Sequence, residues 1–235
     1  VAALQAGVIR AIGKPADRFA EDYLRMLRAV RFASRLGFTI DACTAAAIRM
    51  HAKYLGQISR ERIGQEVQTM LSLPWADGSH KALAAVQSMM DLNLDGPVLH
   101  EDYKYQTVLT VTALDRLNDP GVDYPAMLLG WMIDRHAHLM TSPSDELDLF
   151  NRLRLFASRH AAGLIDRWRR ALVLSNETTS ALTDTLGCVI KALDWSDMSV
   201  AQRKRLLAMP AWPRARAILR ALGYLPALDS LAGRI

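Results

Sequence analysis

Cysteine is nearly absent from this 235-residue chain, which contains only Cys43 and Cys188. Two isolated thiols without a Cys-x-x-Cys pair argue against a disulfide framework or a zinc site, and indicate a reducing, cytoplasmic compartment. The chain also lacks an apolar run near the roughly 20 residues that a membrane-crossing helix needs. Residues 1–7 lack the charged start and cleavage site of a signal peptide. We therefore expect no membrane partner.

An initiator methionine is also missing, and the chain begins directly in patterned sequence. We therefore expect a fragment of a longer chain. Hydrophobic residues make up 51 % and charged residues 23 % of it, a balance typical of one elongated domain or two small ones with a substantial core. The formal net charge is +5, which favours a polyanionic partner.

Helical spacing of apolar residues dominates from residue 16 onward, and the sequence predicts an all-α, elongated multi-helix protein. The exception is Val8–Ile12, which we expect to be a strand or linker from an upstream α/β domain. One helix is predicted over Phe19–Leu36, ended by Gly37 in a left-handed conformation. A turn is predicted at Asp95-Gly96-Pro97. Further helices are predicted over Ala45–Tyr54, Ser59–Leu73, Lys81–Leu92, Tyr105–Leu117 and Tyr124–His138, then, beyond breakers at Asn118–Gly121 and Thr141–Ser144, over Glu146–Leu155, His160–Leu174, Glu177–Leu193, Val200–Met209 and Pro213–Leu222.

Arginines recur at positions 25, 28 and 31, and Asp22 precedes them at the same interval of three. On one continuous helix these four side chains would form a single stripe. A stripe of cations is costly as structure alone because like charges repel. It suits a nucleotide, whose phosphates bind arginine and whose base offers a matched donor and acceptor.

Asp22 and Arg25 together match the hydrogen-bonding edge of cytosine and of adenine. Each of these bases presents an exocyclic amine, which a carboxylate accepts, beside a ring nitrogen, to which a guanidinium donates. Uracil and guanine present a carbonyl and an N–H there, so both contacts become repulsive. The alternative is a surface helix with Glu21–Arg25 and Asp22–Arg28 ion pairs, each contributing a few tenths of a kcal/mol.

Several motifs follow one another in this segment: Gly7-Val8-Ile9-Arg10-Ala11-Ile12-Gly13, Arg18-Phe19, Glu21-Asp22-x-x-Arg25, Leu27-Arg28-Ala29-x-Arg31-Phe32, Leu36-Gly37-Phe38-Thr39-Ile40-Asp41 and Ile58-Ser59-x-Glu61-Arg62-Ile63. In this order they resemble the motifs of the class II tRNA nucleotidyltransferase (CCA-adding enzyme) and bacterial poly(A) polymerase family. Three positions depart from the family pattern: Ala3 and Lys14 stand where aspartate is usual, and Tyr23 stands where proline is common.

The resemblance implies a role for each of these residues. Asp22 and Arg25 would read the base of an incoming ATP or CTP, and Arg28 and Arg31 would support that pair and the triphosphate. Glu21 would support the reading pair. The helix start that contains Glu61 and Arg62 would brace the helix that carries the arginines.

The resemblance also implies a linker over residues 1–16, a nucleobase-recognition neck over 17–98 and a helical body over 99–235. The catalytic head, with its phosphate loop, metal-binding aspartates and Mg²⁺, would precede Val1, so we expect this segment to be inactive alone. The body carries a degenerate metal-phosphohydrolase segment, with Gln106, Gly130 and Trp131 at the places of metal ligands. No metal site is expected, and His136 and His138 are expected on the surface.

Two clusters of basic residues in the body are candidates for contacts with RNA phosphates: Arg167, Arg169, Arg170, and Arg203, Lys204, Arg205. Each is alternatively a solvated helix face. Trp168, Trp195 and Trp212 are expected to pack between helices. The implied function is addition of C or A residues to RNA 3′ ends, with tRNA foremost, from CTP and ATP. The alternatives are a poly(A) polymerase and a non-catalytic helical RNA-binding protein.

Overall fold

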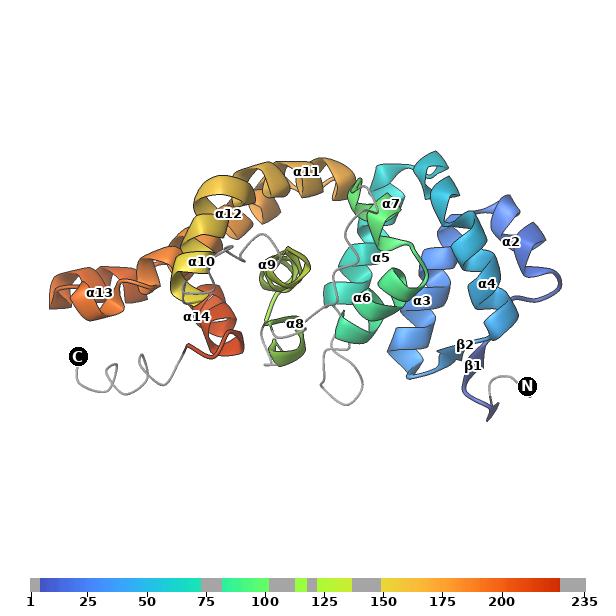
Figure 1. The fold of residues 1–235 in the computed structure, drawn as a ribbon, viewed down its shortest axis with the longest axis horizontal. Coiled ribbons are helices and arrows are strands. Elements are labelled where there is room, and N and C mark those ends of the chain that lie inside the picture. The colour runs from blue at the N-terminus through green and yellow to red at the C-terminus, as the bar shows by residue number, and fades with distance from the viewer. Residues whose placement is uncertain (1–4, 73–81, 102–112, 118–121, 137–148, 225–235) are drawn as a thin grey trace. The chain divides into compact units, whose positions relative to one another are not determined.

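The computed structural model describes residues 5–72, 82–101, 113–117, 122–136 and 149–224 (Figure 1). Over these residues the regular secondary structure is helical apart from two strands of two residues each, which confirms the all-α prediction. It divides into two compact units, one of residues 1–106 and 167–174 and the other of residues 107–166 and 175–235. No helix within the described ranges is long and apolar enough to cross a membrane.

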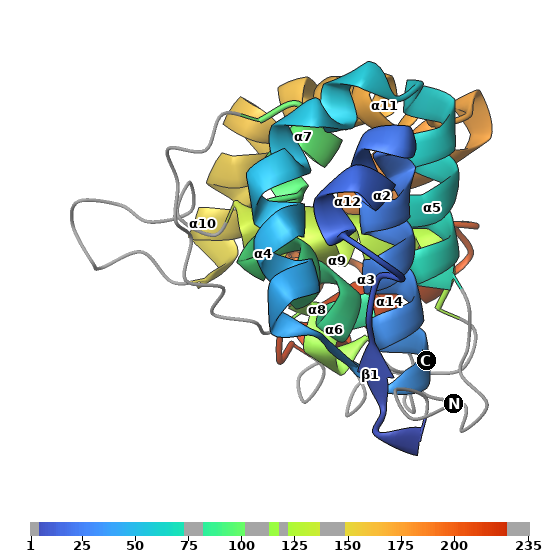
Figure 2. The ribbon, with the colours of Figure 1, turned by 90° about the vertical axis from the view of Figure 1, so that its right-hand side faces the viewer.

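Helix α3 (Leu24–Leu36) is the centre of the first unit. It packs against α2, α5, α6 and both strands (Figure 2), and Met26, Leu27 and Val30 are fully buried. The remaining elements of this unit are β1 (Val8–Ile9), α2 (Pro15–Glu21), β2 (Thr39–Ile40), α4 (Ala42–His51), the 3₁₀ helix η1 (Ala52–Gln57), α5 (Arg60–Ser72), α6 (Ala82–Asp91) and α7 (Asp95–Leu99).

The continuous helix predicted over residues 19–36 is wrong, because the chain breaks at Asp22. This residue is extended (φ −159°, ψ 105°) and ends α2. Its carboxylate accepts a hydrogen bond from the Leu24 amide at 3.1 Å, and its carbonyl accepts one from the Arg25 amide, also at 3.1 Å. Aspartate competes in this way for backbone donors and favours helix starts over helix interiors. Asp22 therefore lies just before α3 and is not part of the helix that carries Arg25, Arg28 and Arg31.

Gly37 ends α3 as predicted, with φ +65° and a hydrogen bond from the Phe38 amide to the Ala33 carbonyl at 2.9 Å. The turn leads directly into β2, which pairs in parallel with β1. The segment expected to belong to an upstream domain thus finds its strand partner within the first unit. The pairing was missed because two residues are too few to show a strand pattern.

The turn predicted at residues 95–97 is also wrong, since Asp95 begins α7. Proline needs no amide partner in the first turn of a helix, so Pro97 is compatible with this start. The helix ends at His100, whose φ is +54°.

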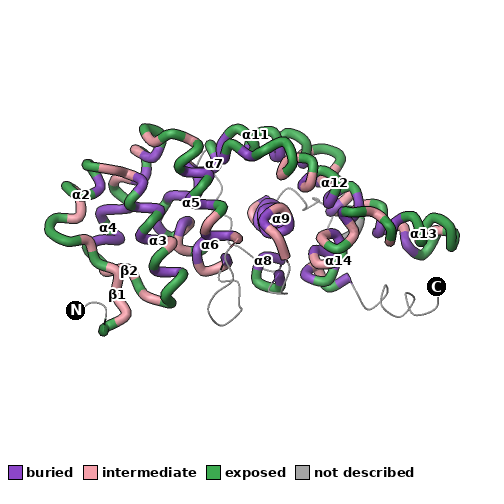
Figure 3. The backbone as a smooth tube through the Cα atoms, turned by 180° about the vertical axis from the view of Figure 1, so that it is seen from behind, coloured by how far each residue is buried: buried purple, intermediate pink, exposed green. Residues whose placement is uncertain are grey.

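Helix α12 (Asn176–Ala192) organises the second unit and packs against α9 (Tyr124–Arg135), α13 (Val200–Leu207) and α14 (Trp212–Ala221). The residues of α9 are almost entirely buried (Figure 3). The other elements are α8 (Ala113–Arg116), α10 (Leu149–Phe156), the π-helix η3 (Ala157–Ala161) and the 3₁₀ helix η4 (Trp195–Asp197). Helix α11 (Ala162–Leu172) follows η3.

The degenerate metal-site segment falls on α9. Trp131 is fully buried, and a Cβ added to Gly130 would meet Leu117 Cδ1 at 2.4 Å, so both positions serve helix packing. The expectation that His136 lies on the surface is wrong: it is 6 % exposed, and its Nδ1 lies 2.9 Å from the Met132 carbonyl oxygen. Gln106, His138 and the predicted breakers Asn118–Gly121 and Thr141–Ser144 lie outside the described residues.

Candidate nucleotide-binding site

Asp22 is held at the start of α3 by a neighbour from α5. Arg62 Nη2 donates to Asp22 Oδ2 at 2.8 Å, while Oδ1 accepts from the Leu24 amide. Partial burial alone would raise the pKa of this carboxyl, but the hydrogen bonds from Arg62 and Leu24 outweigh it and the net pKa is lowered. The carboxylate is therefore ionised at neutral pH and keeps lone pairs for a further donor.

Arg25 is positioned by α2. Its Nη1 donates to Glu21 Oε2 at 2.5 Å and to the Arg18 carbonyl at 3.0 Å. Glu21 also accepts from Arg18 Nη1 at 2.7 Å. The hydrogen bond from Arg25 is the largest cause of the lowered pKa of Glu21. Of the two ion pairs proposed for a plain surface helix, Glu21–Arg25 forms, whereas Asp22 pairs with Arg62 in place of Arg28.

Arg28 and Arg31 converge on one buried acid that the sequence reasoning did not single out as a site residue. Glu66 of α5 lies 3.2 Å from Arg28 Nε and 3.1 Å from Arg31 Nε, and its side chain is 9 % exposed. The available signal was its place among Ile63, Val67 and Met70, on the apolar face of α5. A buried carboxylate between two guanidiniums fixes both of them.

Glu61 and Arg62 of α5, which were both expected to brace α3, differ in their contacts. Arg62 contacts Asp22 directly, whereas Glu61 is exposed in the first turn of the same helix. The bracing expected of this helix start is made by Arg62 and, one turn further on, by Glu66.

A pocket of about 460 Å³ opens beside α3 in the first unit. Its lining residues include Arg10, Arg18, Arg25 and Arg28, with Phe19 and Phe32 on the apolar side. This volume is in the range of small-molecule sites. Asp22 and Arg31 are not among the lining residues, so the structure brings Arg25 and Arg28 to this cavity but not the other two predicted residues.

The first basic cluster flanks a buried anchor. Arg167, Arg169 and Arg170 are exposed on α11, while Trp168 between them is fully buried and donates its Nε1–H to Glu101 Oε1 at 2.9 Å. Arg60 of α5 donates to the Ala171 carbonyl at 2.7 Å. Helix α11 thus ends on α5 and presents these arginines outward.

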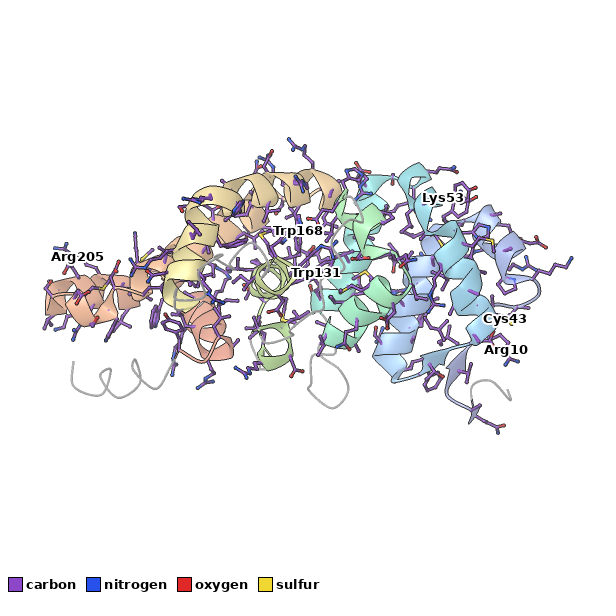
Figure 4. All side chains as sticks on the ribbon, viewed as in Figure 1. Arg10, Cys43, Lys53, Trp131, Trp168 and Arg205 are labelled. Carbon is purple, nitrogen blue, oxygen red and sulfur yellow. The ribbon has the colours of Figure 1, made fainter. Side chains whose placement is uncertain are left out.

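The second basic cluster is divided in its role. Arg203 donates to the carbonyls of Trp195 and Ser196 at 3.1 and 3.2 Å, and its guanidinium lies 5.3 Å from the Trp195 ring centroid. Trp195 is buried and stacks on Trp212. Lys204 and Arg205 are exposed, and Arg205 extends away from the ribbon of α13 (Figure 4).

Comparison with known proteins gives concordant matches. Residues 37–94 match the family model described as the probable RNA and SrmB-binding site of polymerase A. A CCA-adding enzyme of Lactiplantibacillus plantarum is 28 % identical over 232 residues, which cover 95 % of this chain and 47 % of that protein. These matches are to a poly(A) polymerase family model and to a CCA-adding enzyme, the two kinds of protein that the sequence motifs resemble. The chain spans about half the length of this relative.

A second relative and a solved structure are also similar to this chain. A CCA-adding enzyme of Lacticaseibacillus paracasei is 52 % identical over 69 residues, which cover 29 % of this chain and 17 % of that protein. Among solved structures, a tRNA-processing enzyme in an apo form matches with a TM-score of 0.61 and 19 % identity, covering 98 % of this chain and 60 % of that one. At this identity the likeness concerns the fold alone.

Proposed function

We propose that this chain is the neck and body of an RNA nucleotidyltransferase that adds C or A residues to 3′ ends, with tRNA as the substrate. The observation that carries the proposal is the pair Asp22 and Arg25 at the start of α3, each held by its own ion pair, to Arg62 and Glu21. One group accepts and the other donates, which suits the edge that cytosine and adenine share.

The ion pairs give each group a fixed direction before a nucleotide binds. Asp22 stays ionised because its pKa is lowered, so it accepts from the exocyclic amine and repels the carbonyl of uracil or guanine. Arg25 donates to the ring nitrogen. Arg28 lines the same pocket as Arg25 and pairs with Glu66, as does Arg31. Arg28 and Arg31 support the triphosphate. Discrimination by such a two-contact edge amounts to about 1–3 kcal/mol.

The remainder of the proposal concerns domains and partners. Residues 17–98 form the neck and residues 99–235 the body, and the six basic residues on α11 and α13 contact RNA phosphates. Mg²⁺ chemistry belongs to residues outside this chain. Among the described residues no group of three His, Cys, Asp or Glu side chains suits a metal ion. A poly(A) polymerase of the same family would use the same neck.

Nucleotidyl transfer and RNA binding, measured together on the purified chain, test this function. We expect tRNA to bind with an affinity that falls log-linearly with salt, because bound phosphates release counterions. We also expect no extension of the tRNA with CTP or ATP. Extension by this chain alone would place the chemistry here, and absence of RNA binding would contradict the proposed body.

A further inference from the structure

Three aromatic rings from separate elements of the first unit meet beside Asp22. The centroids of Tyr23 and Tyr54 lie 5.1 Å apart with an interplanar angle of 26°. The His51 ring lies 6.2 Å from Tyr23 and 5.8 Å from Tyr54. The cluster therefore joins the start of α3, the end of α4 and η1.

The rings are half-buried, unlike the core aromatics, so part of each ring reaches solvent. Lys53 Nζ lies 5.1 Å from the Tyr54 centroid, and its side chain extends away from the ribbon (Figure 4). The His51 Nδ1 lies 2.8 Å from the Ala47 carbonyl, which can only accept, so Nδ1 carries the proton and the ring is fixed in orientation. The patch is thus aromatic, ordered and flanked by positive charge.

These features match what unpaired nucleic acid requires. Bases that are not in a duplex stack on aromatic side chains, and nearby cations contact the backbone, without dependence on base identity. Selection of a nucleotide by Asp22 and Arg25 leaves this cluster unused. Tyr23 is also one of the positions at which this chain departs from its family.

We propose that Tyr23, His51 and Tyr54, with Lys53, form a stacking platform for an unpaired base of single-stranded RNA. The proposal rests on the proposed RNA-binding function but not on the identity of the nucleotides that are added. Tyr54 and Lys53 lie within residues 37–94, the stretch that matches the family model. Because Asp22 adjoins Tyr23, the platform would hold RNA next to the base-reading pair.

The test uses the 235-residue chain and a short single-stranded RNA with the fluorescent base 2-aminopurine at its 3′ end. Stacking on an aromatic ring quenches this base. We expect quenching by the wild-type chain, its loss in Tyr54→Leu and Tyr23→Leu, and its retention in Tyr54→Trp. We expect both leucine variants to weaken binding by about fivefold or more, since base–aromatic stacking is sequence-tolerant and substantial.

The matched control is Phe38→Leu, which removes a half-buried ring at the other end of α3. It should leave quenching and affinity unchanged. Lys53→Ala should lower the salt slope by about 0.7 while quenching remains. If RNA binds with a normal salt slope but quenching is unaffected in both leucine variants, the platform is wrong and the RNA-binding function stands. If the wild-type chain binds no RNA, both are wrong.

Discussion

The arginines of α3 and the basic residues of α13 are alike in sequence but are held differently in the structure. Arg25, Arg28 and Arg31 each pair with a carboxylate, either Glu21 or the buried Glu66. On α13, Lys204 and Arg205 are exposed, and Arg203 donates to backbone carbonyls and lies over the Trp195 ring.

This difference separates two kinds of recognition. A guanidinium held by a carboxylate presents its remaining donors in a fixed direction, which reading the edge of a base requires. An exposed lysine or arginine is a charge without a fixed direction, and it attracts phosphates of any sequence. The number of basic residues in a segment therefore does not distinguish a base-recognition site from a surface that binds any anion. The presence of carboxylates that pair with those basic residues does.

Gly64→Ala should have the largest effect, because it disrupts the packing of α5 against the C-terminal end of α11. A Cβ at this position would lie 2.0 Å from the Leu172 carbonyl oxygen. We expect a loss of about 3 kcal/mol in the free energy of unfolding, measured by denaturant titration. Gly163→Ala is the control, because a Cβ added at this position would meet no atom within 4 Å. Its effect on the free energy of unfolding should be neutral or slightly stabilising. Equal effects of the two changes would contradict the close approach of α5 and α11.

Glu66→Gln should have the next largest effect on stability, because it removes the carboxylate with which Arg28 and Arg31 pair. Removing the charge leaves Arg31 half-buried without its counter-ion, which should cost about 2 kcal/mol. Glu61→Gln, on the exposed surface of the same helix, should change stability by less than about 0.5 kcal/mol. Similar unfolding midpoints for the two variants would mean that Glu66 does not anchor the arginines.

Two variants of α13 should separate an effect on stability from an effect on RNA affinity. They are Arg203→Ala and the double variant Lys204→Ala/Arg205→Ala. Arg203→Ala loses two hydrogen bonds to carbonyls and should cost about 1 kcal/mol. The double variant should be as stable as the wild type but should lower the salt slope of tRNA binding by about 1.4. An unchanged slope would mean that Lys204 and Arg205 lie on a solvated helix face and do not contact RNA.

The smallest expected effect is the contribution of Asp22 to the pH dependence of the free energy of unfolding. The pKa of Asp22 is lowered in the folded chain, so its contribution to stability is present above its unfolded pKa, about 3.9. That contribution is lost as the pH falls through the folded pKa. Arg62→Ala should raise the pKa of Asp22, as followed by NMR titration of the carboxyl carbon. An unmoved pKa would show that Arg62 does not hold this carboxylate.

Much of the fold follows from the sequence, because helix ends such as Gly37 and the cap Asp41 have local causes. The break at Asp22 was missed because an i,i+3 spacing of charges was given more weight than the preference of aspartate for helix starts. The burial of His136 depends on helices distant in the sequence and has no local signal.

The candidate site was predictable in part. The motif Glu21-Asp22-x-x-Arg25 indicated the reading pair, but the partners that hold it could not be assigned by spacing. Asp22 and Arg62 are 40 residues apart, and Arg28 and Glu66 are 38 apart. Such pairs are set by how α3 packs on α5. The role of Arg203 is likewise decided by the position of Trp195.

The central claim, that Asp22 and Arg25 select the base, is tested most directly by nucleotide incorporation into tRNA by a full-length nucleotidyltransferase of the proposed kind that carries this chain as its neck and body. With Asp22→Ala we predict that the preference for CTP and ATP over UTP and GTP falls about 10- to 100-fold, with a smaller change in triphosphate affinity. Exchanging the donor and acceptor character of both residues should admit U and G. Incorporation that remains limited to C and A after both changes would contradict the account.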